Sequence, residues 1–276
     1  MITKQFPSLA LADWPATRDT LHGYAEILGA VRGSLSPSQK YSSHRSLLAA
    51  AAGLTTGPIP YGLLTFELLL DLAGHRLVLT TSHGRLWQQR LRGQSQAAFF
   101  DEVTGALAAQ GISVNLDRTQ YANAAAGVYD IAAVERFWEA LAQIDQVLKR
   151  FKGELRGETS AVQLWPHHLD MAVLWFSGRR VPGQETAKPA SADEQMNFGF
   201  STGDGGIPEA YFYITAYPLP TALAATPVPP GTEWHTEGWS GAVLRYAQLV
   251  GAGDAEERLL TYLRTYQQAR MALMRD

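Results

Sequence analysis

The sequence predicts an α+β protein of two similar halves, each an antiparallel sheet flanked by long helices. Three observations lead to this class. Four segments repeat their apolar residues with the period of an amphipathic helix. The segments between the first and second helices, and between the third and fourth, alternate with a period of two, as half-buried strands do. The order helix, strands, helix therefore occurs twice along the 276 residues.

In the first half, a helix is expected from Thr20 to the break at Gly33 and Pro37. Residues 64–72 then alternate, and the turns "AGH" and "SHGR" convert the chain into a three-strand antiparallel meander. A second helix begins after Ser95 and stops at Gly111. The earlier stretch "SLLAAAAG" has helix-forming composition. We assign it to a strand because a similar run in the second half ends the same way, in a small turn and prolines.

In the second half, the clearest helix opens at Asp130, and the last helix opens at Asp254. Strands are expected between them at 160–177, 196–201, 209–217 and 232–246. The matched order indicates duplication of one unit. The predicted organisation is a first half at 1–116, a linker at 117–129 and a second half at 130–276.

Composition limits the classes of function. The 23 basic and 26 acidic residues give a net charge of −3 without a block of one sign, so neither a nucleic-acid nor a membrane partner is expected. The absence of cysteine excludes disulfides and thiolate catalysis. The N-terminus lacks the apolar region of a secretory signal, and no apolar run reaches the length of a membrane span. We expect a soluble cytoplasmic protein; the oligomeric state is left open.

The most specific candidate for a catalytic or metal-binding motif is His168-x-Asp170, followed by His235 and Arg245. Two histidines and a carboxylate can hold Fe(II), and an arginine about ten residues later can clamp the carboxylate of 2-oxoglutarate. These enzymes need a double-stranded β-helix, which the predicted element order does not provide. The favoured interpretation is that His168 and Asp170 point inward from one side of a central strand and are hydrogen-bonded there, so no metal site is favoured.

Two further groups of residues could bind a ligand. Thr55 and Thr56 end a strand in one half, and Arg179 and Arg180 end a strand in the other, where an interface between halves could accept a carboxylate or phosphate. Aromatic residues crowd the second half, with Tyr211 and Tyr213 on one strand face, and core packing is their alternative role. The candidate ligand-binding residues are Thr55, Thr56, Tyr61, His168, Asp170, Arg179, Arg180, Tyr213 and Trp234.

Four stretches, "GLTTGPIPYG", "RFWEAL", "LDMAVLWFSGRR" and "AYFYITAYP", resemble a bacterial family catalogued only as a domain of unknown function. The resemblance spreads over most of the chain. It implies one architecture throughout and implies no activity. His167 and His168 depart from the small or polar residues usual at that place in the family.

The sequence therefore leaves the function unknown, with a small-ligand pocket near the interface of the two halves as the leading hypothesis. One alternative is a metal-dependent enzyme, such as an Fe(II)/2-oxoglutarate oxygenase using His168, Asp170, His235 and Arg245. The other is a structural protein that binds a partner through aromatic surface. The sequence decides neither whether the protein is an enzyme nor which cofactor it uses.

Overall fold

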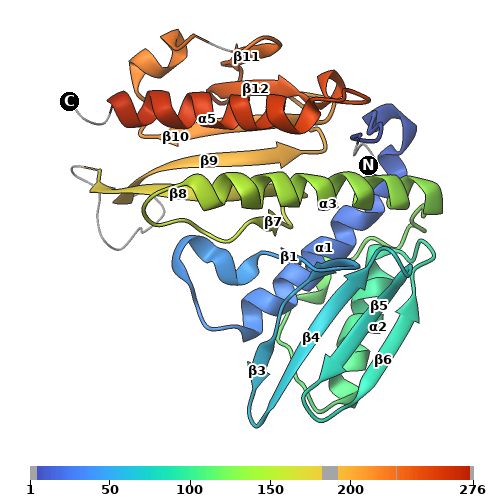
Figure 1. The fold of residues 1–276 in the computed structure, drawn as a ribbon. Coiled ribbons are helices and arrows are strands. Elements are labelled where there is room, and N and C mark those ends of the chain that lie inside the picture. Colours follow the sequence, from blue (N-terminus) through green and yellow to red (C-terminus); the bar gives the residue numbers. More distant parts are fainter. Residues whose placement is uncertain (1–4, 182–191, 228, 274–276) are drawn as a thin grey trace. The chain divides into compact units, whose positions relative to one another are not determined.

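The computed structural model describes residues 5–181, 192–227 and 229–273. It confirms the α+β class, since it contains helices and two antiparallel sheets of six strands each (Figure 1). The chain divides into two compact units. The first unit comprises Trp14–Trp138 and Gln163–Leu169, and the second comprises Met1–Asp13, Glu139–Val162 and Asp170–Asp276. Residues 117–129, expected as a linker, lie inside the first unit.

All four predicted helices are present: α1 (Pro15–Leu35), α2 (Gln96–Ala109), α3 (Ile131–Glu154) and α5 (Ala255–Leu273). The predicted caps explain two of their starts. The Ser95 side chain accepts a hydrogen bond from the Ala98 amide at 3.1 Å, and the Asp130 carboxylate accepts one from the Ala132 amide at 2.9 Å. Helix α1 begins before Thr20, because a proline in the first turn has no amide hydrogen to leave unpaired.

The first sheet has the strand order β1-β2-β4-β5-β6, and β3 also pairs with β4. The expectation that "SLLAAAAG" forms strand is confirmed only in part: β1 covers Leu48–Ala49 and β2 begins at Gly53, whereas residues 50–52 between them are irregular. The alternation predicted for residues 64–72 is also present, with Phe66, Leu68 and Leu70 at most 1% exposed. The strands of this sheet are β1 (Leu48–Ala49), β2 (Gly53–Thr55), β3 (Ile59–Tyr61), β4 (Leu64–Asp71), β5 (Arg76–Thr81) and β6 (Leu86–Arg90).

The second sheet has the order β11-β12-β10-β9-β8-β7. The predicted runs 160–177 and 232–246 each contain two strands with a break between them. The reason is local: residues 166–169 form a turn, and residues 236–240 are irregular. The strands are β7 (Gln163–Trp165), β8 (Asp170–Arg180), β9 (Asp193–Ser201), β10 (Tyr211–Tyr217), β11 (Thr232–His235) and β12 (Gly241–Arg245).

One face of the second sheet packs on helices of its own unit. The Phe151 ring of α3 meets the Phe198 ring with centroids 4.9 Å apart. The Tyr262 hydroxyl of α5 donates to the Ala242 carbonyl at 2.7 Å, and Figure 1 shows α5 alongside β10 and β12. Because side chains alternate along a strand, the residues next to these belong to the opposite face. That opposite face carries the polar residues described below.

Candidate functional site

The structure brings two of the predicted residues together on the second sheet. Asp170 opens β8 and is 7% exposed. Tyr213 lies on β10, and its hydroxyl donates to the Asp170 carboxylate. The Asn197 amide of β9, the strand between β8 and β10, donates to the same hydroxyl at 3.4 Å. A buried acid, a phenol and an amide therefore form one network on the face opposite the helices.

A second phenol–carboxylate pair lies beside the first. Tyr211 has the same face as Tyr213, as the sequence predicted, and its hydroxyl donates to Asp204 at 2.6 Å. The Trp239 ring stacks on Tyr211 and meets Tyr213 edge-on. Burial, followed by the negative charge of Asp170, raises the pKa of Tyr213 well above its ordinary value. Both phenols are therefore held as neutral hydrogen-bond donors.

Gly199 explains how the Tyr213 ring lies flat across the sheet. A Cβ atom at this position would lie 2.3 Å from Tyr213 Cζ and 2.4 Å from its hydroxyl oxygen. Only glycine leaves room for the ring there, which is a use of glycine in a strand where another group approaches closely.

The neutral state of Tyr213 predicts a pH dependence. An unfolded tyrosine loses its proton near pH 10, whereas folded Tyr213 keeps it to higher pH. The folded state then binds more protons, so stability falls as pH rises above about 10. We expect the difference in unfolding free energy between wild type and Tyr213→Phe to shrink by up to about 1.4 kcal/mol per pH unit there. Denaturant unfolding of both proteins at a series of pH values measures this difference. A difference that stayed constant above about pH 10 would contradict the prediction.

The prediction that His168 points inward from the strand of Asp170 is wrong. Residues 166–169 form a turn between β7 and β8, and His168 is exposed in it. Leu169 takes a positive φ of 52°, which reverses the chain before Asp170. The His167 and His168 rings lie 4.2 Å apart by centroid. Burial and the nearby charges of His168 and His22 lower the pKa of His167.

Two of the residues considered for an Fe(II)/2-oxoglutarate site, Arg245 and His235, contact other groups of the protein. Arg245 ion-pairs with Glu209 at 2.9 Å and also binds Glu233, so its guanidinium is not open for a co-substrate carboxylate. His235 Nε2 lies 2.8 Å from the Glu237 carbonyl oxygen. Within residues 5–181, 192–227 and 229–273, no three His, Cys, Asp or Glu side chains are arranged to hold a metal ion.

The remaining candidates are used mainly within the fold. Thr55 and Thr56 bond to Glu67 and to the Leu68 amide, respectively, across β2 and β4. The Tyr61 hydroxyl accepts from the Ser113 amide at 3.0 Å. Trp234 contacts the Tyr266 ring, with centroids 6.4 Å apart. Arg179 and Arg180 lie exposed at the end of β8.

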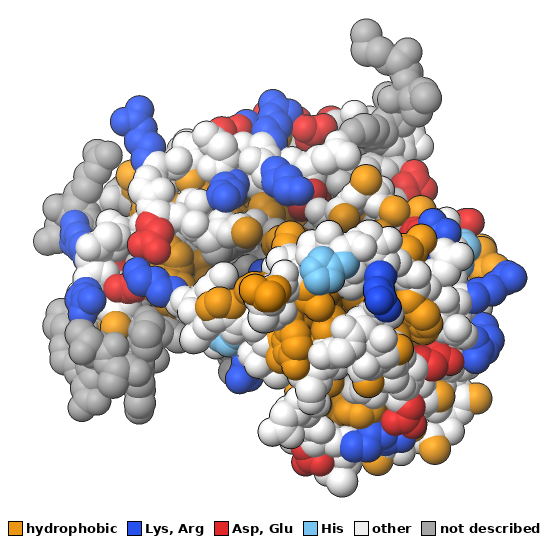
Figure 2. Space-filling model, turned by 90° about the horizontal axis from the view of Figure 1, so that it is seen from below, with side chains coloured by type: hydrophobic (Ala, Val, Ile, Leu, Met, Phe, Trp, Pro, Cys, Tyr) orange, Lys and Arg blue, Asp and Glu red, His pale blue; other side chains and the backbone are white. Residues whose placement is uncertain are grey.

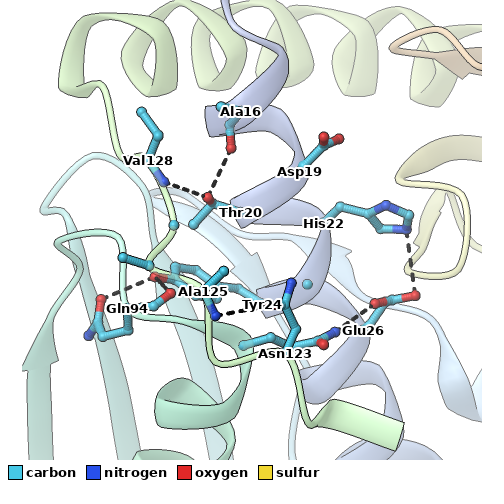
Figure 3. A pocket seen from close by; sticks show the side chains of 14 residues that line it. Ala16, Asp19, Thr20, His22, Tyr24, Glu26, Gln94, Asn123, Ala125 and Val128 are labelled. Carbon is cyan, nitrogen blue, oxygen red and sulfur yellow. Dashed lines mark hydrogen bonds and ion pairs between the residues drawn. The ribbon is translucent and has the colours of Figure 1, made fainter.

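Sequence reasoning missed a cavity of about 320 Å³ in the first unit (Figure 3). One wall is a face of α1, from Ala16 through Thr20 and Gly23 to Glu26, at the three- and four-residue spacing of a helix. The opposite wall is the irregular segment 123–128, and Gln94 and Gln96 close one side. Small residues on both walls leave the space open. Alanine and glycine at these positions form no periodic pattern from which a cavity could be predicted.

The segment 123–128 is held firmly against α1. The Thr20 hydroxyl accepts from the Val128 amide at 3.0 Å and donates to the Ala16 carbonyl at 2.9 Å (Figure 3). A Cβ at Gly127 would lie 2.7 Å from the Thr20 hydroxyl oxygen, so glycine is required for this approach. The cavity is therefore formed by fixed contacts before any ligand enters.

Charged groups on the cavity wall are mostly acidic. Asp19 and Glu26 contribute carboxylates, and no lysine or arginine is among the described residues that line the cavity. Glu26 accepts from the Gln96 amide at 3.2 Å, and His22 Nε2 lies 3.8 Å from its other oxygen. These contacts fix the Glu26 carboxylate at the wall.

No curated protein and no solved structure matches the chain. One family model matches residues 6–275, which is nearly the whole chain and agrees with the resemblance noted in the four sequence stretches. No function is assigned to that family. The chain belongs to the family of unknown function DUF5996.

Proposed function

We propose that the protein binds a small polar ligand in the cavity between α1 and the segment 123–128. The observation that carries this is the cavity itself, which is about 320 Å³ and is lined by hydroxyl, amide and carboxylate groups. Its size is at the lower end for small-molecule sites, which suits a compact metabolite. The contacts of Thr20 and Gly127 already order the two walls, so the free energy of ordering them does not reduce the affinity for a ligand.

The wall chemistry selects the ligand. Glu26 attracts an ammonium group and repels anions, and Asp19 adds a second carboxylate although it also pairs with Arg18 at 3.0 Å. Thr20, Gln96 and Asn123 offer partners to hydroxyls or amides. A ligand that carries an amine together with hydroxyl or amide groups fits this set best. Glu26 is the residue on which amine recognition should depend, because a charged hydrogen bond contributes more than a neutral one.

The test is a screen of small amines, amino acids and polyols by amide chemical shifts. Binding compounds should move the signals of residues 123–128, and amines should bind Glu26→Gln about tenfold or more weakly. Gly105→Ala is the matched control, because an added Cβ at Gly105 in α2 would have no heavy atom within 4 Å and would not line the cavity. The proposal would be refuted if no compound moved these signals. It would also be refuted if amines bound the wild type and Glu26→Gln equally.

We also infer that the two halves arose by duplication, with long helices flanking each sheet. Strands β2 and β8 each lie second from one end of their sheet. Leu47 and Leu164, one from each predicted half, exchange two backbone hydrogen bonds of 2.8 Å. Superposition of the helix–sheet–helix units at 20–111 and 130–273 in a crystal structure is the direct check. Buried residues of α1 and α3 also correspond at a constant separation of 116 positions: Leu21 and Phe137, Tyr24 and Ala140, Ala25 and Leu141, Leu28 and Ile144, and Val31 and Val147.

A soluble, cytoplasmic bacterial protein without nucleic-acid or membrane partners remains part of this proposal. Figure 2 supports it, since basic and acidic side chains are interspersed on the face that it shows. In the described part of the chain, none of the helices has the length and apolarity that a membrane crossing requires. Cell fractionation with an antibody against the chain would test the compartment.

A further inference from the structure

The last turn of α1 holds an arginine whose partners are neutral groups. Arg32 is partly buried, and its Nη1 donates to the Ser46 carbonyl oxygen and, at 3.0 Å, to the Ser46 hydroxyl. Among the residues that the structure describes, no Asp or Glu pairs with its guanidinium. Burial lowers the pKa of Arg32 from its ordinary value, which is the expected effect of removing water without adding an opposite charge.

Such a cation is costly unless something compensates it. A charge withdrawn from water is normally paired, because desolvation of an ion outweighs what neutral partners return. The carbonyl end of α1 compensates only in part, since a helix terminus acts as about half a charge. Arg32 therefore keeps part of its capacity to attract an anion.

His44 adds a neutral donor beside this charge. It is 8% exposed, and its Nδ1 accepts from the Gln39 amide at 3.2 Å. The proton of the neutral ring must then be on Nε2, which is left to donate. Burial, followed by the positive charges of Arg45 and Arg32, lowers the pKa of His44. Arg45 is the next residue in the chain, and Arg32 bonds to Ser46, two residues after His44.

Gln163 supplies a buried amide on the other side of Ser46. Its side-chain oxygen accepts from the Ser46 hydroxyl at 2.9 Å, and the residue is 2% exposed. Its Nε2 is buried and has no hydrogen-bond partner in the described structure. A buried donor in this condition requires an acceptor, because leaving it unpaired carries the full cost of desolvation.

The Arg45 side chain packs against α1 at Gly33, where the absence of a side chain leaves room for it. A Cβ at Gly33 would lie 2.8 Å from Arg45 Cγ, so the arginine stem rests on the helix at that point. The chain reaches this position through residues 40–45, in which Tyr41 and Ser42 both have positive φ. Arg32, His44 and Arg45 thus gather at one end of α1, within the first unit.

We propose that this end of α1 is a binding site for a phosphate group, either inorganic phosphate or a phosphate monoester. Two guanidinium groups and an imidazole N–H provide charge and several donors, which a tetrahedral oxyanion with several acceptor oxygens can satisfy together. The site is separate from the cavity of Figure 3, whose carboxylates would repel an anion. Its test is therefore independent of the ligand proposed there.

The experiment is a titration of the full chain with inorganic phosphate at constant ionic strength, followed by the ring signals of His44. We expect a saturable shift, and a similar shift with glycerol phosphate if the site accepts monoesters. Acetate and chloride should give no saturable shift. Arg32→Gln and Arg45→Gln should each weaken binding about tenfold or more, since each removes charged hydrogen bonds. Arg18→Gln is the control, because Arg18 also lies on α1 but pairs with Asp19.

Arg45 is exposed, so Arg45→Gln remains informative even if Arg32→Gln fails to fold. The proposal is overturned if phosphate gives no saturable shift of His44. It is also overturned if binding survives unchanged in Arg45→Gln, or if acetate binds as well as phosphate. A response to inorganic phosphate but not to glycerol phosphate would support the site and restrict it to the free ion.

Discussion

Leu141→Ala is expected to lower the free energy of unfolding by about 2–5 kcal/mol. Leu141 lies in α3 and is 1% exposed, and its neighbours along the same face, Ile144 and Leu148, are fully buried. The substitution removes buried methyl groups and leaves a cavity that the surrounding side chains fill only in part, so both terms destabilise the fold. Denaturant unfolding measures this loss. An unchanged dependence of the free energy on denaturant concentration would show that the substitution changed stability and not the compactness of the unfolded state.

Leu63→Ala is the matched control for this substitution. Leu63 is 101% exposed at the turn between β3 and β4. The same change of side chain there should alter stability by no more than about 0.5 kcal/mol. If Leu141→Ala costs less than about 1 kcal/mol, or no more than the control, α3 does not line a packed core as its periodicity predicts.

The helices were predictable because their signals are local. The apolar spacing of α3, the cap at Asp130 and the cap at Ser95 all lie within a few residues of the structure that they determine. The strand assignment of "SLLAAAAG" is different. Its composition favours a helix, and only comparison with the second half pointed to β1 and β2. Pairing of β1 with β2, and of β2 with β4, outweighed helix propensity at this point.

The candidate site was predictable only in part. The shared face of Tyr211 and Tyr213 follows from alternation along one strand, and the structure has it. His168 was misplaced because the run from 160 to 177 predicts one strand, although Pro166 begins the turn at 166–169. The run contains no glycine, and the turn depends instead on a positive φ at Leu169, which a leucine rarely adopts. The cavity could not be read from sequence, since its two walls are about 100 residues apart and are formed by alanine and glycine as much as by polar groups.

Gly53→Ala should be one of the most damaging small substitutions in the chain. Gly53 lies in β2 and pairs with Asp71 of β4. A Cβ there would lie 2.0 Å from the Leu70 carbonyl oxygen and 2.8 Å from the Leu72 amide nitrogen. Both are backbone atoms, one in β4 and one in the residue that follows it, so no side-chain rotation can relieve the overlap, and β2 must move away from β4. We expect a loss of about 3 kcal/mol, at the upper end for overpacking.

Gly105→Ala makes the same chemical change with the opposite expected sign. Gly105 is in α2, its added Cβ would meet no heavy atom within 4 Å, and alanine favours a helix interior by about 1 kcal/mol. Measuring both variants, and the double variant if Gly53→Ala alone does not fold, separates steric overlap from the general effect of replacing glycine. A loss below about 1 kcal/mol for Gly53→Ala would mean that β2 can shift without cost. In that case the close pairing of β2 with β4 would not be what holds the first sheet together at this edge.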